Sequence, residues 1–83
     1  MTNKLRMNNT FRTNDLSISA VLHCLGYKLE AVDRSEPRAV FVFRRSPEID
    51  QTIQAYWADE LSLNPKAFFN SLKELKARIY SID

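Results

Sequence analysis

The chain has 83 residues, 45% hydrophobic and 27% charged, which is the composition of one small globular domain. A single cysteine and a single glycine exclude a disulfide scaffold within the chain, a zinc ribbon and a glycine-rich phosphate loop. The net charge of +2 is too small to indicate any class of partner, so the distribution of charge has to be followed along the chain.

The first twelve residues are polar and basic. They carry Lys4, Arg6 and Arg12 without any acidic residue, and they show no apolar periodicity. This pattern predicts a flexible basic arm over residues 1–12, followed by one globular domain over residues 13–83. Two interpretations of the arm stay open, because a basic arm can reach into nucleic acid and a polar terminus can also simply fray.

A first helix is predicted near residues 14–25, with Thr13 as its N-cap and Gly26 in the left-handed position after its end. One apolar face of this helix consists of Ile18, Val21, Leu22 and Leu25. A second and nearly opposite face consists of Leu16, Ala20 and Cys24. A helix that is apolar on two sides is either central in its domain or buried against another copy, and in so short a chain the pattern predicts a homodimer.

Two strands are predicted next, over residues 27–33 and 39–43, joined by a turn at 34–38. In the first strand Tyr27, Leu29 and Ala31 share one face. The second strand is apolar on both faces, with Phe41 and Phe43 on one side and Val40 and Val42 on the other. The two strands are therefore expected to form an antiparallel hairpin that needs cover from helices, and from a partner chain as well.

Two further helices are predicted at 47–59 and 65–80, since Ser46-Pro47 and Asn64-Pro65 are both cap-plus-proline signals. The predicted fold is an α+β single domain in the order α-β-β-α-α, with an antiparallel β-hairpin packed against three helices. The predicted core consists of Leu22, Leu25, Leu29, Phe41, Phe43, Ile53, Tyr56, Phe68, Leu72, Leu75 and Ile79.

The sequence contains no constellation of residues that indicates catalysis. His23 and Cys24 are helical neighbours that point about 100° apart, so they cannot form a nucleophile–base pair with each other. No set of residues has the spacing of metal ligands, and paired acids such as Glu48 and Asp50 suit the start of a helix. We therefore expect a non-enzymatic protein without catalytic residues, metal or cofactor.

The last predicted helix carries lysines and aromatic rings along one edge, at spacings of 3, 4, 3 and 4 residues. Lysine contacts phosphate, and an exposed aromatic ring can stack on a base. The alternative is a solvated edge whose rings border the core. Together with the arm, the predicted nucleic-acid-binding residues are Lys4, Arg6, Arg12, Lys66, Phe69, Lys73, Lys76 and Tyr80.

A second hypothesis is a protein interface at the first helix, the second strand or the adjacent aromatic pair Tyr56 and Trp57. Tryptophan is enriched at interaction hot spots, although in a short domain it is also a common core residue. The predicted interface residues are Leu16, Ala20, Cys24, Val40, Val42 and Trp57.

Arg44 and Arg45 also have two interpretations. They can join Arg12 and Arg38 in an anion-binding patch, or one of them can pair with Glu30 across the hairpin.

Several short motifs occur in an order that resembles a known family. They are Thr13-Asn14-Asp15-Leu16, Gly26-Tyr27-Lys28-Leu29, Phe41-Val42-Phe43, Ser46-Pro47-Glu48, Tyr56-Trp57, Phe68-Phe69-Asn70, Leu75-Lys76 and Tyr80. The chain is similar over residues 13–80 to an uncharacterised family of short bacterial and phage-like proteins of unknown function. The resemblance implies a compact stand-alone domain and a mobile-element context, and it brings no catalytic residue and no activity.

The leading hypothesis is a small accessory protein that contacts nucleic acid through the basic arm and the lysine-bearing helix edge. The alternative is a protein-binding inhibitor or adaptor. No apolar run approaches the length of about 18–20 residues that spans a membrane, and no secretory signal is present, so we expect a cytoplasmic protein without membrane contact.

Overall fold

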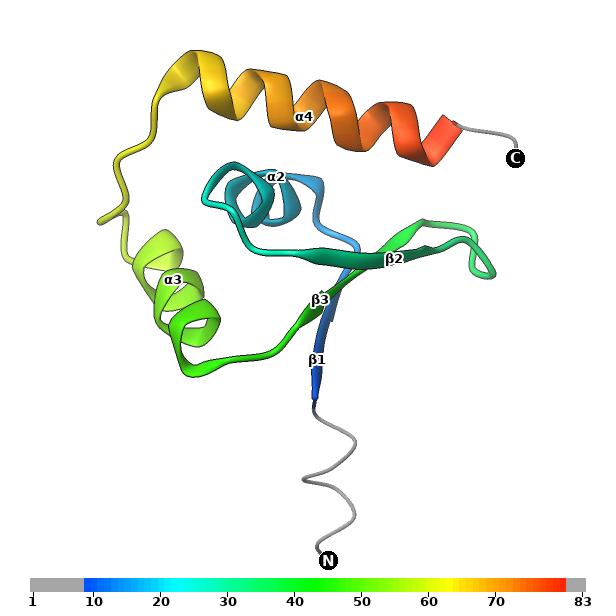
Figure 1. Cartoon of the computed structure of the whole chain (residues 1–83), viewed down its shortest axis with the longest axis horizontal. Coiled ribbons are helices and arrows are strands. Elements are labelled where there is room, and N and C mark those ends of the chain that lie inside the picture. The colour runs from blue at the N-terminus through cyan, green and yellow to red at the C-terminus, as the bar shows by residue number, and fades with distance from the viewer. Residues whose placement is uncertain (1–8, 81–83) are drawn as a thin grey trace, which may run out of the picture.

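A computed structural model describes residues 9–80 of the chain (Figure 1). Its elements are β1 (Thr10–Thr13), α2 (Leu16–Cys24), β2 (Leu29–Asp33), β3 (Val40–Arg44), α3 (Pro47–Trp57) and α4 (Pro65–Tyr80). The three strands form one antiparallel sheet in the order β1-β3-β2. The predicted α+β class, the hairpin and the three helices are therefore confirmed.

The strand β1 was not predicted, and it changes the element order to β-α-β-β-α-α. The expectation of a flexible arm over residues 1–12 is therefore wrong for residues 10–12, and its first eight residues lie outside the described part of the chain. Thr10 pairs with Arg44 and Phe11 with Phe43, which makes β3 the central strand. The strand β1 could not be predicted locally, because it forms only through hydrogen bonds to β3, about 30 residues later in the sequence.

An irregularity in β2 corrects the predicted faces of that strand. Leu29 pairs with Phe43 and Ala31 with Val42, so Glu30 is an extra residue between two consecutive pairs. The bulge places Leu29 on the face of Phe43 and Ala31 on the opposite face with Val42. The expectation that Leu29 and Ala31 share a face is therefore wrong.

The helix starts follow local rules, with one correction. Asp15, rather than Thr13, caps α2: its Oδ1 accepts a hydrogen bond from the N–H of Ile18 at 3.1 Å. Thr13 accepts from the N–H of Asp15 instead, at 3.0 Å. The caps predicted at Ser46 and Asn64 are confirmed, since their side chains accept from the N–H three residues later at 3.2 and 2.9 Å.

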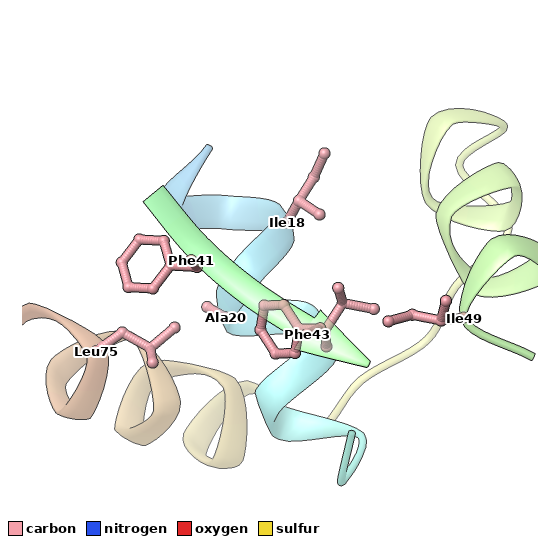
Figure 2. Close-up of a cluster of buried hydrophobic side chains, with 7 residues drawn as sticks. Ile18, Ala20, Phe41, Phe43, Ile49 and Leu75 are labelled. Carbon is pink, nitrogen blue, oxygen red and sulfur yellow. The ribbon is translucent and has the colours of Figure 1, made fainter. Parts of the chain in front are cut away.

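The core lies between the sheet and the helices, with α2 between α4 and the sheet (Figure 1). Phe41 and Phe43 of β3 gather in one cluster with Ala20 of α2, Ile49 of α3 and Leu75 of α4 (Figure 2). The fully buried large side chains include Leu22, Phe41, Phe43, Ile49 and Leu75. Leu25 is a wrong core prediction, because its side chain is 44% exposed at the end of α2.

The helix α2 is central within a single chain. Ile18 and Leu22 on one predicted face and Ala20 on the other are all buried in the same core. The two-sided apolar pattern is therefore satisfied by the sheet and α4, and it no longer argues for a second copy. Self-association stays a prediction, which sedimentation at micromolar concentration tests directly.

Candidate binding surfaces

Five residues predicted to contact nucleic acid lie together on one exposed edge of α4, which we call the lysine edge: Lys66, Phe69, Lys73, Lys76 and Tyr80. The rings do not border the core, since Phe69 is 57% and Tyr80 75% exposed. The ammonium of Lys73 lies 5.6 Å from the centroid of the Phe69 ring, within the range of a cation–π contact. Within residues 9–80 none of the three lysines pairs with an acid.

Arg12 does not belong to the lysine edge. It lies on β1 opposite Val42, on the sheet face turned away from Phe41 and Phe43, whereas Leu75 of α4 packs on the Phe41 side. Its guanidinium pairs with the Asp33 carboxylate at 2.8 Å, so the ion pair crosses the central strand. Lys4 and Arg6 lie outside the described residues.

The carboxylate of Asp33 is the most strongly stabilised charge on this face. The Ser35 hydroxyl donates to it at 2.7 Å, the Ser35 N–H donates at 2.9 Å, and Arg12 donates from β1. These hydrogen bonds, with those from Ser35 contributing most, hold the pKa of Asp33 well below its ordinary value of 3.8.

Acid should therefore weaken the fold through Asp33. A carboxylate whose pKa is depressed on folding contributes stability above its ordinary pKa of 3.8, and this is lost as pH falls through the folded-state pKa. We expect the parent to unfold at higher temperature than Asp33→Asn at pH 7, with a difference that shrinks below about pH 4. Melting curves across pH check this, with Glu36→Gln from the same turn as control. A difference that is constant down to pH 2 would contradict the assignment.

The structure decides between the two interpretations of Arg44 and Arg45. Arg44 pairs with Glu30 across the hairpin at 2.8 Å, which confirms the cross-strand interpretation. Arg45 pairs with Asp50 in the first turn of α3 at 3.3 Å. Both pairs are partly exposed, so each adds little to stability and neither arginine is left as a free anion site.

The predicted protein-interface residues do not form one surface. Ala20 is fully buried and Val42 is only 8% exposed, so neither side chain is available in this conformation. Leu16, Cys24 and Val40 are half-buried. Only Trp57 is strongly exposed, at 67%, which makes the core interpretation of this residue wrong.

Trp57 borders a pocket of about 630 Å³ that the sequence did not predict. The pocket lies where the C-terminal end of α3, the α3–α4 connection and the start of α4 meet α2. Trp57 meets Tyr56 edge to face, with ring centroids 5.0 Å apart and an interplanar angle of 79°. The lining residues are Val21, Tyr56, Trp57, Asp59, Leu61, Leu63, Pro65 and Phe68.

Asp59 lines this pocket in an unusual backbone conformation. The N–H of Asp59 donates to the carbonyl of Tyr56 at 3.1 Å, and that of Glu60 donates to Ala55 at 2.9 Å, which together form a Schellman motif. Asp59 occupies its left-handed position with φ of 60°. That position usually holds glycine, and it costs another residue on the order of 1 kcal/mol.

The end of α2 also forms a Schellman motif, and there the left-handed position holds the usual glycine. Gly26 has φ of 95°, its N–H donates to His23, and the N–H of Tyr27 donates to Leu22. The prediction for Gly26 is therefore confirmed.

His23 takes part in a contact between two helices rather than in a site with Cys24. Its Nδ1 shares a hydrogen bond of 2.9 Å with the Ser71 hydroxyl on α4, and its Nε2 lies 3.9 Å from the Glu74 carboxylate. Ser71 is only 6% exposed, so this hydrogen bond lies inside the α2–α4 contact. It links the two helices through side chains that lie 48 residues apart in the sequence.

The described part of the chain holds neither a cluster of metal-ligating side chains nor a helix that could span a membrane. Between residues 9 and 80, His, Cys, Asp and Glu side chains do not gather in any group of three that could hold a metal ion. Over the same residues, no helix has the length and apolar composition needed to cross a bilayer.

Comparison with known proteins places the chain in a family. No curated protein matches the chain, and no solved structure matches it. A family described as a domain of unknown function, DUF5659, matches residues 8–81, which include every helix and strand of the fold. The chain therefore belongs to the DUF5659 family.

Proposed function

We propose that the protein is a small non-enzymatic accessory protein that contacts nucleic acid through the lysine edge. The proposal rests mainly on one observation: three lysines that have no acidic partner within residues 9–80 share one edge of α4 with two exposed aromatic rings. Lysines neutralise backbone phosphates, and the rings offer flat surfaces to unstacked bases. The proposal extends to a cytoplasmic setting and to the bacterial, phage-like context that the resemblance implies.

The geometry favours single strands over duplex. Phe69 and Tyr80 lie on the same edge as the lysines, and a ring can stack only on a base that has left its partner. The residues of the predicted arm within β1 add nothing to this edge, because Arg12 lies on the other side of the sheet and pairs with Asp33.

A salt titration tests the lysine edge. The combined variant Lys66→Gln, Lys73→Gln, Lys76→Gln should bind a labelled single-stranded oligonucleotide more weakly. If all three lysines contact phosphate, the slope of log affinity against log salt should fall by roughly two. The fold should be unchanged, because all three side chains are exposed.

A matched control removes the same charge from other places. Lys28→Gln, Arg38→Gln, Arg78→Gln also removes three positive charges from a chain of net charge +2, at exposed positions away from the lysine edge. This control should keep the parental slope. Equal losses in both variants would indicate a general charge effect, and no binding by the parent at about 50 mM salt would refute the proposal.

A protein-binding adaptor or inhibitor is the second candidate function. The observation that favours it is the exposed Trp57 beside the pocket. An exposed tryptophan at the mouth of a concave apolar surface is typical of a residue that a partner covers. The first helix, in contrast, is covered within the chain.

A further inference from the structure

The pocket at Trp57 combines apolar walls with a single carboxylate. We propose that it binds an arginine or lysine side chain presented by a segment of a partner protein. The cation would pair with Asp59, and the aliphatic stem would lie among the apolar side chains that line the pocket. This inference rests on the second candidate function and is independent of the lysine edge.

The size and lining of the pocket suit such a group. A volume of about 630 Å³ falls within the range of small-ligand pockets and is ample for one long side chain with its flanking residues. Six of the eight described lining residues are apolar, Tyr56 adds a hydroxyl, and Asp59 is the one charged member. An amphipathic side chain with an apolar stem and a cationic end matches this lining.

The carboxylate of the pocket has no partner in the described part of the chain. Within residues 9–80 no hydrogen bond or ion pair involves the Asp59 side chain, whereas Asp50 of α3 is paired with Arg45. The neighbouring Glu60 is also acidic and exposed, which adds to the attraction for a cation. Trp57 and Tyr56 offer ring surfaces that can add a cation–π contact.

The backbone at Asp59 gives a second argument. The Schellman motifs at the ends of α2 and α3 differ at the left-handed position, where α2 has Gly26 and α3 has Asp59. Glycine would be the less strained residue at both. Strain that is retained beside a pocket is typical of residues kept for binding, and here the retained group is the carboxylate.

The exposed Trp57 argues for a protein rather than a free amine as the source of the cation. A small amine inside the pocket would leave most of a tryptophan that is 67% exposed in contact with water. A polypeptide that inserts one basic side chain would cover the ring with its flanking residues, as at interaction hot spots. The partner segment should therefore be a basic residue between apolar ones.

Peptide binding tests the proposal, with Trp57 as reporter because it is the only tryptophan. The probe is the end-blocked peptide Gly-Ala-Leu-Arg-Leu-Ala-Gly, and the comparison peptide has glutamine in place of arginine. The arginine peptide should change the Trp57 fluorescence saturably. The glutamine peptide should bind about three- to tenfold more weakly, as expected for loss of a partly exposed charge pair.

Two carboxylate-free variants and one control separate charge from shape. Asp59→Asn keeps the shape and tolerates the left-handed backbone, and Asp59→Gly removes the strain, so both should fold at least as well as the parent. Both should lose the preference for arginine over glutamine. Glu60→Gln removes the neighbouring carboxylate, which is not among the pocket lining, and should keep that preference.

Several outcomes would overturn the inference. They are equal binding of the two peptides by the parent, an unchanged preference in Asp59→Asn, and no saturable response at millimolar peptide. A Trp57 response to an oligonucleotide would assign the pocket to nucleic acid, and dimerisation abolished by Trp57→Leu would assign it to a second copy. A failure of the lysine-edge titration leaves the inference standing, because those variants do not alter the pocket lining.

Discussion

Replacing Phe43 with alanine is expected to remove a large part of the stability of the domain. The Phe43 side chain is fully buried on the central strand, directly between Phe11 on β1 and Leu29 on β2. Truncating a buried phenylalanine costs about 3–5 kcal/mol, since its contacts are lost and a cavity is left. A domain of this length has a total stability of roughly 4–12 kcal/mol, so the variant should be largely unfolded or melt far below the parent.

Urea unfolding followed by circular dichroism measures this effect. Phe69→Ala is the matched control, because Phe69 is 57% exposed on the lysine edge and its loss should change stability by less than about 0.5 kcal/mol. A Phe43→Ala protein within 1 kcal/mol of the parent would show that β3 does not lie at the centre of the core.

Leu75→Ala is the second large effect that we expect, at about 2–5 kcal/mol. Leu75 is completely buried, and with Ser71 it is one of two buried residues described on α4. Because so few buried side chains hold α4 in place, truncating Leu75 should let this helix open locally at a lower free energy than the rest of the fold. Amide hydrogen exchange should therefore rise along α4 more than in β3.

Leu72→Ala provides the comparison on the same helix. Leu72 is half-buried and packs against the rim of the core, so its truncation should cost clearly less than that of Leu75. If the two variants were equally destabilised, α4 would be rotated relative to the described packing. If exchange in β3 and α4 rose together in Leu75→Ala, the helix would not be an independently opening unit.

Local signals explain the parts of the fold that could be predicted from sequence. Ser46 and Asn64 cap helices by hydrogen bonds to residues three positions away, and Gly26 ends α2 within one turn. Such interactions are complete within a few residues, so the sequence pattern is sufficient. The misplaced cap of α2 shows the limit, since Thr13 and Asp15 are both good capping residues and the choice depends on where β1 ends.

Non-local pairing explains what was missed. β1 is the run Thr-Phe-Arg-Thr, in which Phe11 and the two threonines favour a strand, but four residues next to a polar terminus are too short a pattern to predict one. The bulge at Glu30 also leaves no signal in the local sequence, because it is a property of the pairing register between β2 and β3.

The two candidate sites also differ in whether they depend on local or on non-local structure. The lysine edge follows from helical spacing within one element, and its residues were predicted individually. The pocket draws on residues from Val21 to Phe68, in segments whose meeting depends on the packing of three helices. Sequence reasoning placed Asp59 as the last residue of the helix predicted at 47–59, whereas α3 ends at Trp57, so the left-handed position of Asp59 was not recognised.

The position of β3 at the centre of the sheet has a consequence for folding during synthesis on the ribosome. β1 and α2 are made first, but β1 has no partner until Arg44 has been synthesised. At 5–20 residues per second, the interval between Thr13 and Arg44 lasts about two to six seconds. Until then Ile18 and Leu22, once made, have no sheet to cover them, so α2 can bury its apolar side chains only after the middle strand has been synthesised.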